Sequence, residues 1–430
     1  MMHFSDFFEL EKRQTTVKTE ILAGVTVFVM TCYIFALNPS VLGQAGMPAD
    51  AVFTATGIAS VLAMSVMGLC ANLPIVMSGG MGLNAFLVYT VCMNMGYSYQ
   101  TGLAALLITG LAFMVLSQFK VRDLVINALP VALKNAVSAG IGLFIAFVGL
   151  QAGGIVVPSS GTFVSLGNLH TPEAIMFLFG LFFTFALFLR GVRGGFLIGI
   201  AATTLLGVFL GVTKIPDDFS FFSMPAAPLF CDFSFKEIVS LDFFLICFTF
   251  LFLNVFDTLG TLLAICSQAN LLQKDGSIPK VKQAFFSAGF GTFAGAVFGT
   301  TVTGFIESSS AVAEGGRTGL SAVCAAFLFA VALFLSPVFL LVPFEAIAPV
   351  LVIIGFLMAS SLSRIDFSNL SDGFPAFVCL LSMVVTYSIV NGIVFGLLSA
   401  VFCATIGGRV REIHSFTWFL CVVCLLKLIV

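Results

Sequence analysis

The stretch GTTVTGFIESSSAVAEGGRTG, residues 299–319, decides the fold. It begins with β-branched threonines and a valine and continues with polar residues, so it does not make a continuous lipid-facing helix. The stretch PIVMSGGMGLNAFLVYT, residues 74–90, is interrupted in a similar way by Gly79, Gly80 and Gly82. Backbone groups freed by such interruptions survive at membrane depth only where protein or a cavity satisfies them. Each stretch therefore predicts a short extended segment followed by a half-helix.

The composition points to a membrane protein. The 430 residues are 60% hydrophobic and 9% charged, whereas a soluble domain has roughly 25% charged residues. The net charge of −2 and the lack of a basic tract argue against a nucleic-acid partner. The 11 cysteines form no C-x-x-C pair with histidine spacing, so neither a zinc site nor a disulfide framework is expected, and no cofactor is implied.

The spacing of apolar runs predicts an all-α polytopic protein. A helix needs about 20 apolar residues to cross the hydrocarbon core. Fourteen candidate spans follow: residues 20–37, 51–69, 77–94, 101–118, 133–151, 173–189, 195–211, 241–265, 283–299, 301–315, 320–341, 344–361, 374–390 and 391–407. Residues 416–430 are also apolar but too short for a span, which favours a helix packed on the bundle or at the interface over a fifteenth span.

The basic residues give an independent test of this count. With the N-terminus in the cytoplasm, fourteen spans place 15 of the 18 Lys and Arg residues on the cytoplasmic side. Lys214 and Lys236 fall outside, and Lys427 lies in the terminal tail. Cytoplasmic loops are expected to hold this excess. Residues 1–19 are charged and lack the apolar core of a signal peptide. We therefore expect a multi-pass cell-membrane protein with both termini in the cytoplasm.

Seven spans followed by seven more form an inverted repeat, because an odd number forces the second half to enter the membrane upside down. Secondary transporters are commonly built this way. The two interrupted segments are the third and tenth spans, at corresponding positions of the two halves, and such pairs point to a transport site. The alternative is that the glycines of residues 79–82 merely permit close helix packing.

Three acidic residues fall inside predicted spans: Asp257, Glu307 and Glu314. An ionised carboxylate at the bilayer centre costs at least roughly 2.5 kcal/mol, so such residues indicate function by default. Burial favours the neutral form of a carboxyl group, which makes Glu307 a candidate proton carrier as well as a ligand. A carboxyl group also accepts from, or when protonated donates to, the edge of a nucleobase. Glu314 lies beside Arg317, where a gating or anchoring ion pair competes with substrate contact.

At these residues the chain resembles the adenine/guanine/hypoxanthine permeases, the AzgA-like branch of the nucleobase–cation symporters. The matching motifs are GMGLNAF at residues 80–86, FDTLGT at 256–261, and GTTVTGFIESSSAVAEGGRTGLSAV at 299–323. The opening span, GVTVFVMTCYIFALNPSVL, is similar too. The resemblance covers nearly the whole chain. Position 254, often acidic in this branch, is Asn254 here, which puts a coupling role for that position in doubt.

The resemblance implies proton-coupled symport of a purine nucleobase by movement of a core domain against a gate domain, and a homodimer through the gate. The core would comprise residues 20–118 and 241–341, and the gate residues 119–240 and 342–407, with residues 408–430 as a tail. The base would contact Asp257, Glu307, Asn84, Gly80, Phe305 and Ser308. Asp257 and Glu307 would also couple the proton, and Glu314 with Arg317 would form the candidate gating pair.

Other interpretations either keep this fold with a different cargo or assign the chain to a different class of protein. A uracil or xanthine carrier, or an anion transporter, would share the architecture, although an anion site would not offer two acids. An intramembrane aspartyl protease would use two buried acids, but its GxGD motif is absent. A channel would carry rings of charge rather than lone acids on interrupted helices. No enzymatic activity is expected.

Overall fold

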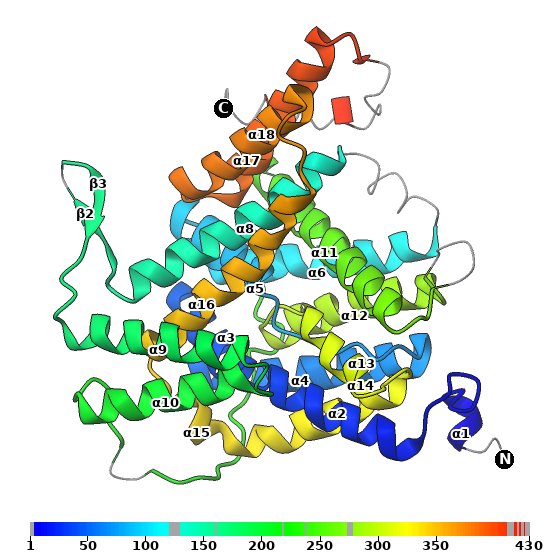
Figure 1. Ribbon diagram of the computed structural model, residues 1–430. Helices are drawn as coiled ribbons and strands as arrows, with labels where there is room; N and C mark the ends of the chain where they lie inside the picture. Colours follow the sequence, from blue (N-terminus) through cyan, green and yellow to red (C-terminus); the bar gives the residue numbers. More distant parts are fainter. Residues whose placement is uncertain are drawn as a thin grey trace.

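The computed structural model describes residues 4–119, 130–159, 161–216, 219–236, 238, 240–272, 278–410, and Thr417, Trp418, Cys421, Val422 and Leu425. Most of them are helical (Figure 1). The predicted apolar tail, residues 416–430, lies largely outside the described residues.

In the first half of the chain the described residues form nine α-helices, three short 3-10 or π helices and three strands. In chain order the elements are α1 Phe4–Phe7, α2 Val17–Thr31, α3 Ile34–Leu42, η1 Gly43–Ala45, α4 Ala49–Val66, η2 Met67–Ala71, β1 Met77–Ser78, α5 Met81–Ala85, η3 Phe86–Asn94, α6 Tyr99–Gln118, α8 Val131–Ala152, β2 Val156–Ser159, β3 Phe163–Leu166, α9 Pro172–Leu189 and α10 Gly195–Phe209.

The second half of the chain has long helices and one short strand. Its elements are α11 Leu241–Gln268, α12 Val281–Phe298, β4 Thr303–Gly304, η4 Ile306–Ser308, α13 Ser309–Ala313, α14 Gly319–Ala332, η5 Leu333–Leu335, α15 Ser336–Leu340, α16 Phe344–Ala359, η6 Ser360–Arg364, α17 Leu370–Val385 and α18 Ile389–Ile406.

Within the described residues, nine helical stretches are long and apolar enough to cross a membrane. Three shorter apolar helices accompany them: Met81–Asn94, Gly195–Phe209 and Leu370–Val385. The last two predicted spans divide at residues 386–388 rather than after residue 390. Tyr387 adopts a left-handed conformation with φ of 53°, and the Ser388 hydroxyl accepts from the Asn391 N–H to begin α18. These local features mark a boundary that hydropathy alone does not reveal.

A small β-hairpin departs from the all-α prediction. β2 and β3 pair antiparallel between α8 and α9, with Val156 opposite Leu166 and Ser159 opposite Phe163. The hairpin projects beyond the helices in Figure 1. Its sequence carries a visible signal, since apolar and β-branched residues flank a Ser- and Gly-containing turn. The all-α expectation overlooks this loop because it considers only runs of membrane length.

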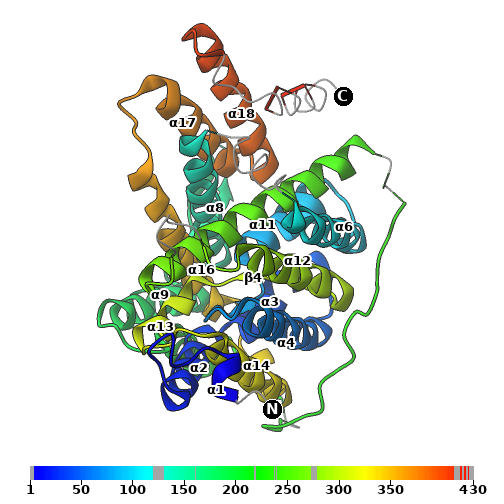
Figure 2. The same ribbon diagram turned by 90° about the vertical axis from the view of Figure 1, so that its right-hand side faces the viewer.

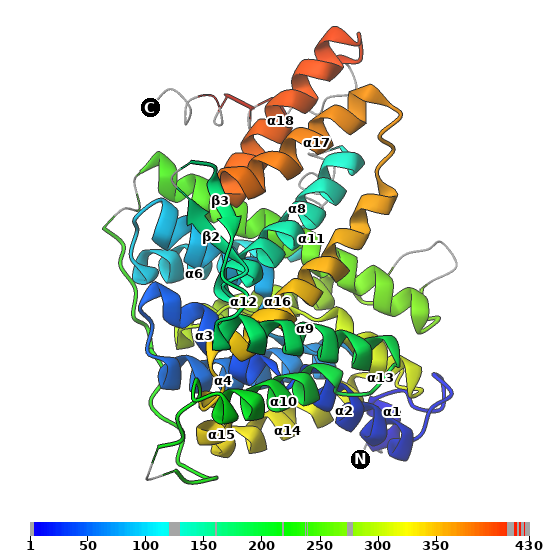
Figure 3. The same ribbon diagram turned by 60° about the vertical axis from the view of Figure 1, so that its left-hand side comes forward.

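The long helices divide into two packed groups. One group contains α8, α9, α10, α16, α17 and α18, which pack mainly on one another. α9, α10 and α16 lie side by side in Figure 3. The other group contains α2, α3, α4, α6, α11, α12 and α14. The groups meet where α8 packs on α5, α10 on α2 and α16 on α3.

The connection that follows α10 stays outside the bundle. Residues 219–236 run in an extended path along one side of the molecule (Figure 2). Tyr99 at the start of α6 holds this segment by donating to Asp232 at 2.9 Å. The segment therefore links the two halves of the chain without entering the packed groups.

Candidate transport site

Two strands from opposite halves of the chain pair at the centre of the second group. β1 and β4 run antiparallel, with Met77 opposite Gly304 and Ser78 opposite Thr303. The Phe305 N–H extends the ladder by donating to the Val76 carbonyl at 2.9 Å. Each strand leads into a short helix: β1 into α5, and β4 into η4 and α13. The two stretches, residues 74–90 and 299–319, therefore contact each other through their strands.

Ser308 and Gly80 hold the two strands together. The buried Ser308 hydroxyl accepts from the Val76 N–H at 2.9 Å, and the Gly80 N–H donates to the Thr301 hydroxyl at 3.1 Å. A Cβ at Gly80 would lie 2.3 Å from Cγ2 of Thr303. Glycine is therefore needed at position 80 because the opposite strand leaves no room for a side chain.

This contact predicts the effect of a single added methyl group. Gly80→Ala forces Thr303 or its strand to move, and overpacking of this kind costs about 1–3 kcal/mol. We expect the purified Gly80→Ala protein to have a lower melting temperature than the wild type. Gly82→Ala is the matched control, since its added Cβ meets nothing closer than Ile141 at 3.7 Å. Equal melting temperatures of the two variants would contradict the prediction.

Asp257 lies in the middle of α11, against β4. Its Oδ2 accepts from the Thr303 hydroxyl at 2.5 Å. One turn further on, the Thr261 hydroxyl donates to the Gly304 carbonyl at 3.4 Å, which holds the strand along the helix. The Asp257 side chain is exposed although its neighbours Val255 and Thr258 are buried. Asp257 therefore lies at an exposed position of α11 while the helix packs on the strand.

Glu307 reaches the same region from η4. Its Oε1 accepts from the Tyr33 hydroxyl at 3.0 Å, across 274 residues of sequence. Glu307 is half-buried, whereas its neighbour Ile306 is 48% exposed. η4 packs against α11, and Thr303, which donates to Asp257, lies four residues before Glu307. The two acids that the sequence singles out therefore lie on neighbouring elements.

An exposed face of α11 leads to Asp257. None of residues 249–255 is exposed, but from Asp257 onward the exposed positions continue at helical spacing to the end of the helix. These positions are Asp257, Gly260, Leu263, Ala264, Ser267 and Gln268. Most of them are small or polar, and a Cβ at Gly260 would meet nothing within 4 Å. The exposed positions thus run from Asp257 to the end of α11 that carries Gln268.

Asn84 belongs to a buried polar network rather than to this open face. Its side-chain nitrogen donates to Asn38 at 2.5 Å, and its oxygen accepts from the Thr301 hydroxyl at 2.6 Å. Asn38 also donates to Thr56 at 2.5 Å and to Thr300 at 2.7 Å. Asn84 is fully buried. The network fixes the start of α5 against residues 300–301, so Asn84 supports the strand pair from behind.

Phe305 and Asn254 also lie inside the packed core. Phe305 is 7% exposed, and its contribution to the strand pair is its backbone N–H. Asn254, one turn before Asp257, is buried and donates to Thr292 on α12. Its side chain therefore reaches α12, while Asp257 lies on the exposed face of α11.

Glu314 has a different partner from the one that the sequence suggests. Its carboxylate forms an ion pair with Arg193, which lies between α9 and α10 in the first group of helices. The Arg317 guanidinium instead donates to the carbonyls of Val312 at 2.7 Å and Gly316 at 2.8 Å. Gly315, with φ of 94°, reverses the chain after α13. Glu314 and Arg317 therefore do not lie on successive turns of one helix.

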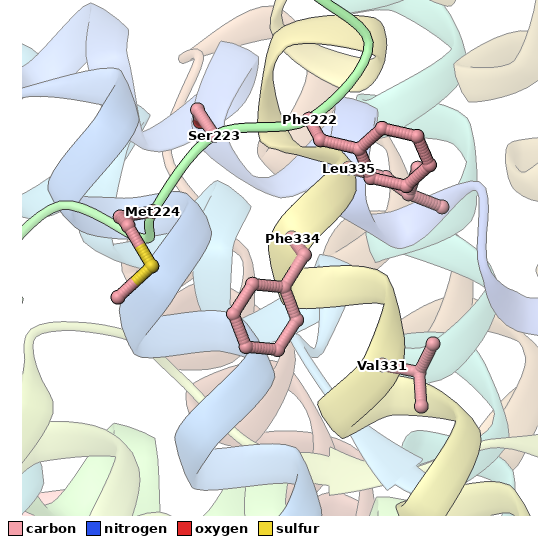
Figure 4. A pocket seen from close by; sticks show the side chains of 6 residues that line it. All are labelled: Phe222, Ser223, Met224, Val331, Phe334 and Leu335. Carbon is pink, nitrogen blue, oxygen red and sulfur yellow. The ribbon is translucent and has the colours of Figure 1, made fainter.

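Tyr33, Thr303 and Arg193 contact the three acids that the sequence singles out, and sequence reasoning misses them. Their partners are distant in the chain, and a Tyr, a Thr or a loop Arg in an apolar sequence gives no signal of its own. A surface pocket lined by Phe222, Ser223, Met224, Val331, Phe334 and Leu335 is shown in Figure 4. None of these six side chains ionises, and the pocket lies apart from the strand pair. Among the described residues no cluster of His, Cys, Asp and Glu could hold a metal ion.

Comparison with known proteins places this geometry in a family. Residues 18–395 match the model of the Permease family. The chain is 41% identical to the guanine/hypoxanthine permease PbuO of Bacillus subtilis, over 95% of this chain and 96% of that protein. It is 35% identical to the adenine permease AdeP of Escherichia coli, over 98% of this chain and 95% of that protein. These relatives confirm the resemblance stated from the motifs.

The fold is shared with a distant transporter. The transmembrane domain of a cyanobacterium bicarbonate transporter, BicA, superimposes with a TM-score of 0.63 at 15% identity, over 89% of this chain and 97% of that one. At such low identity the similarity shows a shared fold and does not indicate the cargo. The family model and the near full-length relatives agree with each other. The chain belongs to the Permease family of membrane transport proteins.

Proposed function

We propose that this protein carries a purine nucleobase across the cell membrane together with protons. The observation that carries the proposal is the meeting of Asp257 and Glu307 at one open face beside the paired strands. Each carboxylate accepts a hydrogen bond from a protein hydroxyl, which orients it beside the strands. Purines offer ring N–H groups and exocyclic amines or carbonyls that fit such acceptors. Relatives named for adenine, guanine and hypoxanthine support this cargo.

The architecture proposed for this function is fourteen spans in two inverted repeats. α2 with α3, and eleven further helical stretches, would cross as continuous or kinked spans, while β1–α5–η3 and β4–η4–α13 would each cross as one interrupted span. The group containing α8, α9, α10, α16, α17 and α18 would be the gate, and the other group the core. Rocking of one group against the other gives alternating access in such folds.

The orientation and assembly follow from the same proposal. The basic residues place both termini in the cytoplasm. The exposed face of α11 then opens toward the cytoplasm, because Gln268 is at the cytoplasmic end of that helix. A homodimer through the gate would leave the core free to move.

An anion is the cargo that the site disfavours. The fold comparison includes a bicarbonate transporter, but an anion between Asp257 and Glu307 would meet two like charges. Like charges a few ångströms apart repel strongly in a site of low dielectric constant. A neutral, planar ligand with hydrogen-bond donors fits the same two carboxyl groups. Uracil or xanthine remains the nearest alternative cargo.

Competition between bases tests the cargo. Uptake of tritiated adenine and of tritiated hypoxanthine is measured in cells lacking their own purine permeases, with unlabelled adenine, guanine, hypoxanthine, xanthine, uracil and bicarbonate as competitors. We expect at least one of adenine, guanine and hypoxanthine to inhibit strongly. Inhibition by uracil or xanthine alone would move the cargo to that class, and no uptake of any base would reject the proposal.

Replacing Glu307 tests proton coupling. Glu307→Gln keeps the size of the side chain and removes its titratable group, so a carrier that moves its proton through this residue loses coupling. We expect the remaining base transport to equilibrate rather than accumulate, and to become insensitive to a protonophore. The measurement is the steady-state ratio of internal to external base in vesicles with an imposed pH gradient. Accumulation at the wild-type ratio would assign the proton to another residue.

A further inference from the structure

The two site carboxylates are held in the same way by unrelated residues. Asp257 Oδ2 accepts from the Thr303 hydroxyl at 2.5 Å, and Glu307 Oε1 accepts from the Tyr33 hydroxyl at 3.0 Å. In the described part of the chain, no other side chain donates to either carboxyl group. The bonded oxygen of each acid therefore fixes the direction of its second oxygen.

We propose that Tyr33 and Thr303 are positioning residues that set the angle at which the two carboxyl groups meet the transported base. The inference rests on the proposed function, because it concerns the same site. It adds two residues that contact the acids and are not themselves expected to contact the base. Their effect would be on affinity and on discrimination between bases.

The Thr303 hydroxyl is a fixed donor because its backbone is fixed. Thr303 lies opposite Ser78 in the strand pair, and the Ser78 hydroxyl is in turn bonded to Ser60 on α4 at 2.6 Å. Gly80 leaves Thr303 no space to move toward β1, since even a Cβ there would clash with its methyl group. The donor that holds Asp257 is therefore part of a crowded, fully paired strand.

Tyr33 is fixed by the helices around it. It lies between α2 and α3 and is 1% exposed. Its ring packs edge-on against Phe196 of α10, with ring centres 5.2 Å apart. The hydroxyl end touches Glu307 from the core group, and the ring end touches the gate group. The orientation of Glu307 therefore depends on a residue that contacts both groups of helices.

Losing either hydroxyl frees its carboxyl group to rotate. The terminal torsion of Asp and Glu is broad, so it is set by hydrogen bonds rather than by its own rotamer preference. A hydrogen bond to a charged group contributes enough to change an equilibrium by about tenfold to a hundredfold. We expect Tyr33→Phe and Thr303→Val each to raise KM for adenine or hypoxanthine by about tenfold, while the maximal rate per transporter stays within about twofold.

The test compares variants that differ only in the hydroxyl. Tyr33→Phe keeps the ring on Phe196, Thr303→Val keeps the branched shape, and Thr303→Ser keeps the hydroxyl. Tyr99→Phe is the matched control, because it removes a tyrosine hydroxyl from another carboxylate, Asp232, outside the site. KM and maximal rate are measured with tritiated adenine and tritiated hypoxanthine and normalised to protein in the membrane. Melting temperatures of the purified variants are measured in parallel.

The outcomes separate a positioning role from a structural one. The proposal is supported if KM rises for Tyr33→Phe and Thr303→Val but stays near the wild-type value for Thr303→Ser and Tyr99→Phe. The two hydroxyl-lacking variants should also show a smaller difference in KM between adenine and hypoxanthine. Wild-type KM in both hydroxyl-lacking variants, whatever their melting temperature, would overturn it. If replacing Asp257 and Glu307 also leaves uptake intact, the proposed function fails as well. If only the acid variants lose uptake, the positioning role alone is rejected.

Discussion

Replacing Asp257 with alanine is expected to reduce purine uptake at least a hundredfold while the protein still reaches the membrane. Asp257 lies on the exposed face of α11 and accepts from the Thr303 hydroxyl. Loss of two hydrogen bonds between a charged group and the base would weaken binding by about this factor. The Thr303 hydroxyl would also lose its acceptor, so the strand beside the site would be less well held.

Two companion variants make the result interpretable. Asp257→Asn retains the shape and one acceptor oxygen, so we expect an intermediate loss of uptake if hydrogen bonding dominates. Asp232→Asn alters a carboxylate that binds Tyr99 outside the site and is expected to transport normally. Tritiated adenine uptake is measured together with the amount of each variant in the membrane. Normal uptake by Asp257→Ala, at normal abundance, would remove this residue from the site.

The prediction from sequence succeeds where a local pattern has a physical meaning. Three glycines in residues 79–82 and a β-branched run at residues 300–303 break an apolar segment, and the structure pairs these two segments as β1 and β4. Asp257 and Glu307 are conspicuous because acids are rare in apolar helices. Both features are visible within a few residues of the chain, so no knowledge of the three-dimensional arrangement is needed to find them.

Sequence reasoning does not reach the contacts that join distant segments. Tyr33 is 274 residues from Glu307, and nothing in the sequence TCYIF marks it as a carboxylate ligand. Asn84 looks like a ligand by its place in a motif, yet the structure buries it among Asn38 and Thr301. Glu314 has an arginine three residues away, but the turn at Gly315 directs it to Arg193 instead. Pairing of this kind is decided by tertiary packing and not by spacing.

The Arg193–Glu314 ion pair is expected to break and re-form during every transport cycle. Arg193 belongs to the turn between α9 and α10, and Glu314 follows α13, so the pair connects the proposed gate and core. It lies on the side of the N-terminal segment, since Gly315 next to Glu314 accepts from the Thr15 hydroxyl at 3.3 Å. A permanent bond at this position would prevent one group from moving against the other.

Crosslinking therefore should stop transport, although neutralising the charges should not. The Arg193 side chain is 67% exposed and that of Glu314 is 13% exposed. Because the arginine is solvated, the pair contributes only about 1 kcal/mol, so Arg193→Ala and Glu314→Ala are each expected to change uptake by less than about fivefold. A disulfide needs Cα atoms within about 7 Å, and an Arg–Glu pair spans further. We would join Arg193→Cys and Glu314→Cys with a short, reducible bifunctional reagent, in a background with Cys70→Ser and Cys231→Ser to remove exposed thiols.

The expected result is near-complete arrest of adenine uptake that is reversed by a reducing agent. Each single-cysteine variant treated with the same reagent is the control and should continue to transport. Reversible arrest requires that these two points separate during the cycle, because a reagent that bridges points on one rigid body would leave uptake unchanged. Full uptake by the crosslinked protein would therefore place α9, α10 and α13 in the same moving unit and refute the division into core and gate.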